Sequence, residues 1–156
     1  MADERDHILL ANRNHATLVY LLKEASAHPE WIATVTFYKA VHIVEAVFAT
    51  EMSCHSFSHD DRLRRLKLPR FHGLGISIRP LYAASLVARY LVDFSAKKLG
   101  ESGKVATYRS FADYMTADEV VERLVYKRLN VLEQHAVQFI STEGRTELTR
   151  TQVLVS

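Results

Sequence analysis

The sequence has very little cysteine, proline or glycine. Its single cysteine, Cys54, excludes an internal disulfide framework of the kind that small secreted domains use, and suits a reducing compartment. Because the three prolines and five glycines are so sparse, each one is informative as a marker of where a helix begins or ends.

The chain also lacks a large excess of either basic or acidic residues. The chain has 20 basic and 18 acidic residues and a net charge of +2, whereas non-specific binding of nucleic acid usually shows as a strong basic excess or stripe. The charge balance alone therefore does not indicate a nucleic-acid partner. An apolar fraction of 48% in 156 residues argues against disorder and is enough for one domain with a real core.

Long apolar runs are missing as well. The longest, from Val35 to Ala49, is interrupted by polar residues, among them Lys39 and Glu45, so it does not predict a membrane span. The first residues, MADERDH, are charged and lack the apolar core of a signal peptide. We therefore expect a cytoplasmic protein without a membrane partner.

Apolar spacing predicts five helices and no convincing strand. The predicted helices span residues 6–25, 31–50, 58–68, 80–98 and 117–140. Pro29 and Pro80 suit the first position of a helix, Ser58 suits an N-cap, and Thr116 with Glu119 forms a capping box. The second helix is apolar around most of its circumference and is expected in the middle of a bundle.

These segments predict an all-α fold, an up-and-down bundle of four to five helices. Each apolar stripe needs a partner helix to cover it, and the intervening loops are short. We expect one domain over residues 1–143 and a tail over residues 144–156 that is extended or disordered.

The second to fourth predicted helices carry a familiar combination of residues. Tyr38-x-Ala-x-His42 is followed by Ser58-His59-x-x-Arg62 and later by SLVARY, which ends at Tyr90. Over residues 10–95 the chain resembles the HEPN superfamily of small helical bundles, in particular an uncharacterised bacterial branch. The resemblance implies a HEPN-like bundle of four or five helices that is often a homodimer and needs no cofactor. Known relatives include metal-independent ribonucleases, toxins of toxin–antitoxin systems and RNA- or nucleotide-binding accessory proteins.

Ribonucleases of that superfamily carry an arginine followed, after four to six residues, by a histidine. Arg65 with His72 and Arg128 with His135 have this spacing, which also arises by chance. Pro69 prevents the first pair from sharing a helical face, whereas Arg128 and His135 lie two turns apart on the last predicted helix.

We therefore take Arg128 and His135 as the candidate catalytic pair. The arginine would hold an RNA phosphate, and the histidine would activate a ribose 2′-hydroxyl. Leu129 departs from the family pattern, because the residue after the arginine is usually polar. The alternative is a packing seam with a snorkelling arginine and a hydrogen-bonded histidine.

Basic and aromatic residues elsewhere are candidates for contact with RNA or another anion. They are Arg62, Arg64, Arg65 and Lys67, with Arg70 continuing the same run, and Arg89 and Tyr90 on the fourth predicted helix. A solvated charged surface is the alternative, with Arg89 paired to Asp93 one turn further on.

Histidines allow a third interpretation. His42, His55 and His59, with Glu45 in reserve, could hold zinc, iron or nickel if a metal is bound. We expect instead a structural motif of Tyr38, His42 and His59, in which a buried His42 fixes the loop before the third helix. A carboxylate-bridged di-iron bundle is excluded, because it needs two Glu-x-x-His pairs.

Three functions remain open at this point. The first is an RNA-binding module or divergent metal-independent ribonuclease in RNA metabolism or defence, and the second a noncatalytic dimeric protein working with a partner encoded nearby. The third is a mononuclear metal-binding bundle. The sequence has no phosphate-binding glycine loop, nucleophile elbow or Cys-x-x-Cys pair, which argues against hydrolase and dinucleotide chemistry of those kinds.

Overall fold

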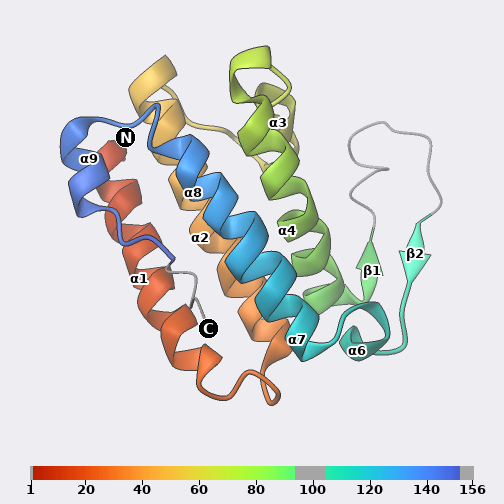
Figure 1. Ribbon diagram of the computed structural model, residues 1–156. Coiled ribbons are helices and arrows are strands. Elements are labelled where there is room, and N and C mark those ends of the chain that lie inside the picture. Colours follow the sequence, from red (N-terminus) through yellow and green to blue (C-terminus); the bar gives the residue numbers. More distant parts are fainter. Residues whose placement is uncertain (1, 94–104, 152–156) are drawn as a thin grey trace.

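Long helices lying side by side form the body of the protein (Figure 1). The computed structural model describes residues 2–93 and 105–151. Its long elements are α1 (Glu4–Leu22), α2 (Pro29–Met52), α4 (His72–Tyr90) and a continuous helix made of α7 (Ala117–Glu119), η2 (Val120–Leu129) and α8 (Asn130–Ala136). The predicted all-α helical bundle is confirmed.

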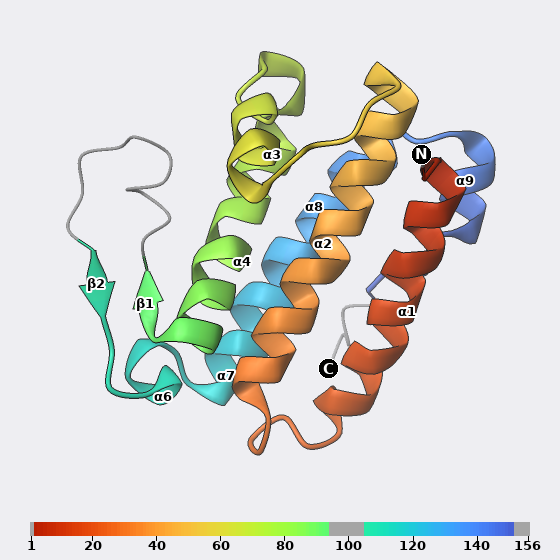
Figure 2. The same cartoon turned by 180° about the vertical axis from the view of Figure 1, so that it is seen from behind.

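Helix α2 occupies the middle of the bundle, with α1, α4 and the η2–α8 helix packed around it (Figure 2). Phe37, Val44 and Phe48 on this helix are almost completely buried, and Pro29 stands at its first position. Among the described residues, α2 alone has the length and composition to cross a membrane. Most of its residues are buried against the other helices, as in the core helix of a globular protein.

Two of the predicted helix starts are confirmed by side-chain caps. The Ser58 hydroxyl accepts a hydrogen bond of 3.1 Å from the Asp61 backbone N–H, and α3 (His59–Arg65) follows. Thr116 and Glu119 form the expected reciprocal capping box at the start of α7. These caps were predictable because they depend only on residues within one turn.

The predicted start of the fourth helix was wrong. Helix α4 begins at His72, directly after the short 3₁₀ helix η1 (Pro69–Phe71), and Pro80 lies inside it. A proline inside a helix removes one backbone hydrogen bond and strains the preceding turn. Leu74, Ile78 and Leu81 on either side of Pro80 are completely buried, so their packing holds the helix together across it.

The end of α4 was also misplaced. It ends at Tyr90, because Leu91 adopts a left-handed conformation with φ of 56°. The predicted continuation to Lys98 lies beyond Asp93, outside the described residues. Strand β1 (Val92–Asp93) pairs antiparallel with β2 (Ala106–Thr107), and α6 (Phe111–Tyr114) leads back to the bundle. Such short strands show no alternating apolar pattern, so the sequence did not predict them.

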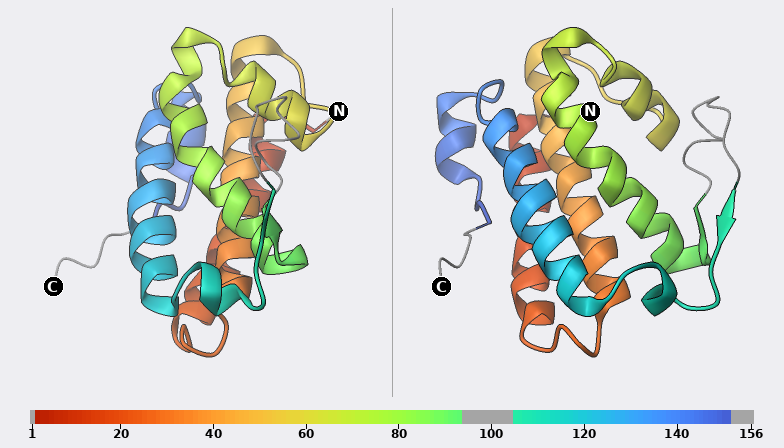
Figure 3. Two further views of the ribbon diagram at one scale, coloured as in Figure 1. Left: turned by 90° about the vertical axis from the view of Figure 1, so that its right-hand side faces the viewer. Right: turned by 45° about the vertical axis from the view of Figure 1, so that its right-hand side comes forward.

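The C-terminal part differs from the expected tail as well. Helix α9 (Thr142–Glu147) follows a turn after α8 and packs beside α1 (Figure 3). Its N-cap, Ser141, accepts a hydrogen bond of 3.0 Å from the Gly144 backbone N–H. The chain then runs to Thr151, which is buried, so residues 144–151 are ordered against the bundle. Residues 152–156 of the predicted tail lie outside the described residues.

Candidate functional site

Three histidines meet where α1, α2 and the loop before α3 come together. The Nε2 atom of His7 lies 3.0 Å from Nδ1 of His55, and its Nδ1 atom lies 3.4 Å from Nδ1 of His42. Glu45 joins them, with its Oε2 atom 3.6 Å from Nδ1 of His55. We call these four residues the histidine cluster. His7 and Glu45 are buried, and the His55 side chain is 20% exposed, so the cluster opens toward solvent on the side of the loop.

Two neighbours fix the Glu45 carboxylate. Its Oε1 atom accepts a hydrogen bond from Nε of Arg62 at 2.7 Å and another from the Ser56 hydroxyl, and its Oε2 atom accepts the Ser56 backbone N–H at 3.0 Å. Burial raises the pKa of Glu45. The Ser56 hydrogen bonds and the Arg62 charge together lower it by more, so the net shift of the pKa is downward. Glu45 is therefore a carboxylate at neutral pH.

Burial also determines the charge of the histidines. Burial lowers the pKa of His7, and the neighbouring His55 lowers it further. Burial likewise lowers the pKa of His42, and the neighbouring His7 lowers it further. Both imidazoles are therefore neutral at pH 7. A neutral imidazole beside a fixed carboxylate is the form that binds transition metals.

The predicted metal trio was only partly right. Among the described residues, the metal-capable group with ligand atoms close together is His7, Glu45 and His55, so His7 replaces His42 and His59 of the predicted set. His42 remains in contact with His7 on the side away from His55. His59 lies on α3, where its Nδ1 atom is 2.6 Å from a guanidinium nitrogen of Arg62.

His59 lies instead in an aromatic cluster, with ring centroids of Phe37 and Tyr82 at 5.2 Å and 5.4 Å and that of Tyr38 at 6.4 Å. The structural motif of Tyr38, His42 and His59 is therefore divided between two environments. Tyr38 and His59 share the aromatic cluster, while His42 faces α1. The buried Tyr82 hydroxyl has no hydrogen-bond partner.

Most of the predicted basic contacts are already engaged within the chain. Arg62 is 7% exposed and paired with Glu45, so its guanidinium is engaged inside the chain and not on the surface. Arg64 and Arg65 both pair with Asp61, and Arg65 also donates to the Cys54 sulfur.

Other members of that set differ in exposure. Arg70 and Lys67 are both exposed, and Arg70 pairs with Glu51. Arg89 donates to the Ser85 carbonyl at 3.0 Å and reaches the Tyr38 hydroxyl at 3.4 Å, beside the exposed ring of Tyr90. The α3 region is therefore a network of ion pairs, in which Arg64, Lys67 and Arg70 are exposed.

Arg128 and His135 lie on the η2–α8 helix, as predicted, at the end of η2 and within α8. Both side chains are half-buried, and Leu129 and Leu132 between them are fully buried. They therefore lie along the edge of the apolar stripe. The His135 ring packs on α4 at Gly73, where a Cβ atom would come within 2.7 Å of the ring. The π-helical hydrogen bonding of η2, which ends directly before α8, is rare and is often found at functional sites.

A second polar network surrounds a buried ion pair inside the bundle. Nζ of Lys39 on α2 lies 2.6 Å from Oε1 of Glu133 on α8, and both side chains are 0% exposed. The same ammonium contacts His15 Nδ1 at 2.9 Å, the Thr149 carbonyl at 3.0 Å and the Thr151 hydroxyl at 3.3 Å. Thr151 in turn donates its backbone N–H and its hydroxyl to Glu133. This network, the buried lysine network, binds the C-terminal segment to α1, α2 and α8.

We expect His15 to make the protein less stable in acid. Burial and then the Lys39 charge lower its pKa from 6.5 to about 4, so the folded state keeps a neutral imidazole that the unfolded chain protonates. His15 therefore contributes stability above pH 6.5 that is lost as the pH falls toward 4. Urea unfolding across this range should show a smaller pH dependence for His15→Gln than for the wild type. His28→Gln, at an exposed histidine, should keep the wild-type slope.

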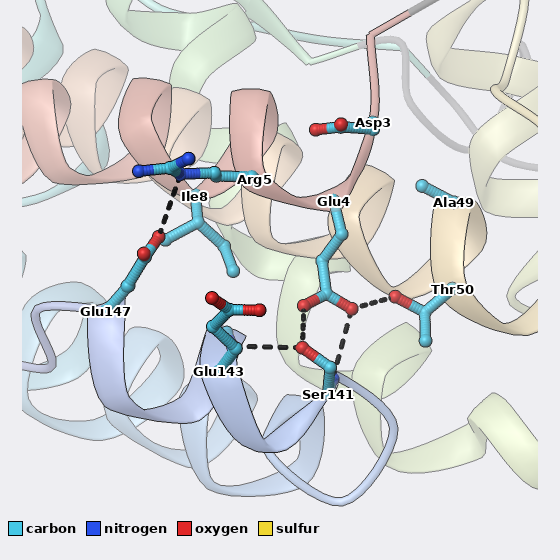
Figure 4. Close-up of a pocket in the computed structure, with 10 residues that line it drawn as sticks. Asp3, Glu4, Arg5, Ile8, Ala49, Thr50, Ser141, Glu143 and Glu147 are labelled. Carbon is cyan, nitrogen blue, oxygen red and sulfur yellow. Dashed lines mark hydrogen bonds and ion pairs between the residues drawn. The ribbon is translucent and has the colours of Figure 1, made fainter.

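An acidic hollow of about 470 Å³ lies between α1, α2 and α9 (Figure 4). The Glu4 carboxylate at its centre accepts hydrogen bonds from the Thr50 and Ser141 hydroxyls and from the Ser141 backbone N–H. Arg5 lies 3.6 Å from Glu147 at its edge. These contacts fasten α9 to α1 and α2, which gives the hollow a structural role.

The sequence did not predict His7, Lys39, His15 or Glu133 as site residues. A signal for two of them was present, since His7, Ala11 and His15 recur every fourth residue and therefore share one helical face. That face is the one α1 turns toward α2. The partners of Lys39 were not predictable locally, because they come from distant parts of the chain.

No family model matches this chain, and neither does any curated protein or solved structure.

Proposed function

We propose that the protein is a HEPN-like helical bundle that acts on RNA, with Arg128 and His135 as its reactive pair. The observation that supports this most directly is their position, half-buried at the edge of the apolar stripe on a single long helix. An arginine and a histidine placed in this way can reach a ligand without leaving the packed helix. The resemblance of residues 10–95 to the HEPN superfamily supplies the reaction class.

In this proposal Arg128 binds the scissile phosphate, and His135 takes the proton of the ribose 2′-hydroxyl as its oxygen attacks phosphorus. The bond between phosphorus and the 5′-oxygen breaks in the same step, and the leaving 5′-oxygen takes a proton from water. A homodimer would bring the two helices face to face and supply a second arginine and histidine. The lone thiol of Cys54 suits a cytoplasmic setting, and an antitoxin-like partner encoded nearby fits a toxin of this kind.

The test compares RNA cleavage by the wild type and Arg128→Ala/His135→Ala. Loss of acid–base and phosphate-binding groups should lower the cleavage rate about 10²–10⁴-fold. The matched control is Arg123→Ala/His72→Ala, which removes an exposed arginine and an exposed histidine elsewhere and should cleave at the wild-type rate. RNA binding without cleavage by any variant supports the RNA-binding form of the proposal. Equal cleavage by both double variants, or neither cleavage nor binding by the wild type, overturns it.

A second candidate is a noncatalytic dimeric interaction protein. Its support is the exposure of large apolar side chains, with Tyr20 at 71% and Trp31 at 59% on either side of the α1–α2 turn and Phe57 at 92% before α3. Aromatic residues are enriched where proteins bind each other. Light scattering on the same preparation separates the two candidates, because a dimer that neither binds nor cleaves RNA fits only the second.

A further inference from the structure

The histidine cluster brings together ligand atoms from three separate parts of the chain. His7 comes from α1, Glu45 from α2 and His55 from the loop between α2 and α3, and one ligand atom of each lies within 4.8 Å of the others. His55 Nδ1 faces both His7 Nε2 and Glu45 Oε2. Two of the separations are 3.0 Å and 3.6 Å. Ligands that bind one zinc ion tetrahedrally at about 2.0–2.1 Å lie roughly 3.4 Å apart. The cluster therefore needs only small side-chain movements to surround an ion.

The surrounding contacts resemble the outer shell that orients metal ligands. His7 Nδ1 lies 3.4 Å from His42 Nδ1, which leaves Nε2 facing His55, and a ligating histidine usually has its other ring nitrogen hydrogen-bonded in this way. Arg62 and the Ser56 hydroxyl hold Oε1 of Glu45, so Oε2 is the atom turned toward His55. Oε2 accepts only the Ser56 backbone N–H there, and a carboxylate oxygen has a second lone pair for a metal.

The charge of the site limits the kind of metal ion that it can bind. Glu45 supplies one negative charge, and the Arg62 guanidinium, 2.7 Å from its Oε1 atom, offsets part of that charge. A calcium or magnesium ion, which depends on several oxygen ligands, gains little at such a site. Zinc, nickel, cobalt and copper bind well to imidazole nitrogen, which makes up two of the three ligands.

We infer that His7, Glu45 and His55 form a binding site for one divalent transition-metal ion, with His42 positioning His7. The partly exposed side of His55 gives the ion a path in and leaves a further coordination position for water or a ligand. The site goes beyond the proposed function, which uses no metal and lies on the η2–α8 helix. A bound ion would fasten α1, α2 and the α2–α3 loop to one another.

The test uses untagged, metal-free protein titrated with Co²⁺, whose visible absorption reports coordination, and with Zn²⁺ in a calorimeter. We expect one equivalent to bind and the melting temperature to rise. His55→Ala is the principal variant, because His55 lies in a loop and its loss leaves the helix contacts intact. Its affinity should fall by more than about 100-fold, beyond the 10–100-fold typical of losing an outer-shell partner. His42→Ala should fall within that smaller range.

His72→Ala, at an exposed histidine on α4, is the matched control and should bind as the wild type does. Circular dichroism before the titration confirms that each variant is folded, and His7→Gln serves as the second ligand variant should His55→Ala unfold. Absence of binding by the wild type overturns the inference. Binding that survives both His55→Ala and His7→Gln overturns it as well. Neither result bears on RNA cleavage, which is measured on other residues.

Discussion

Glu133→Ala is expected to lower the free energy of unfolding by about 3–5 kcal/mol, the range for removing one partner of a buried ion pair. Both side chains of the Lys39–Glu133 pair are 0% exposed, so the variant leaves an ammonium group in the core without its counter-charge. Thr151 also loses the carboxylate that accepts both its N–H and its hydroxyl. Burial already lowers the pKa of Lys39, and without Glu133 it should fall further.

Urea unfolding monitored by circular dichroism gives the measurement. The control is Arg123→Ala, which removes an exposed arginine paired with Glu119 and should change stability by less than about 1 kcal/mol. Lys39→Met/Glu133→Leu separates charge from packing, because apolar replacement of a buried pair is often neutral or stabilising. The double variant should be more stable than Glu133→Ala. An effect of Glu133→Ala no larger than that of Arg123→Ala would falsify the role given to the buried lysine network.

Arg62→Met is expected to cost about 3 kcal/mol of unfolding free energy, near the lower end of the same range. The Arg62 and Glu45 side chains are 9% and 6% exposed, and Nε lies 2.7 Å from Oε1. Ser56 still holds the Glu45 carboxylate after the substitution, which limits the loss. The variant also frees His59 from its contact with the guanidinium.

Arg64→Met is the matched control, since the Arg64 side chain is 73% exposed and its pair with Asp61 measures 3.4 Å. It should alter stability by less than about 1 kcal/mol. The comparison also distinguishes a structural arginine from an RNA contact. Folded Arg62→Met protein should bind RNA as the wild type does, and a selective loss of RNA affinity at unchanged stability would contradict the structural role.

The sequence predicted those features of the fold that depend on neighbouring residues. The predicted caps at Ser58 and Thr116 were confirmed, because each cap forms its hydrogen bonds within a single turn. Apolar residues around most of the circumference of α2 correctly predicted that this helix lies in the middle of the bundle. Pro80 misled the prediction, because the local preference of proline for a helix start was overridden by the burial of Leu74, Ile78 and Leu81.

The candidate site was harder to predict than the fold. His55 and Glu45 were among the named residues, but their partner His7 lies 48 residues before His55 in the chain. Which of eight histidines meet depends on how α1 docks on α2, and apolar spacing gives the buried face of each helix without their relative register. The burial of Arg62 was not predictable for the same reason, since its partner Glu45 lies on another helix.

The buried lysine network also affects when the core can form during synthesis on the ribosome. Lys39 emerges from the ribosome in the middle of the most apolar helix, whereas Thr149 and Thr151 follow 110 and 112 residues later. Until they and Glu133 arrive, α2 cannot bury this lysine as a satisfied ion pair. The core around Lys39 can therefore be completed only after Glu133, Thr149 and Thr151 have been synthesised.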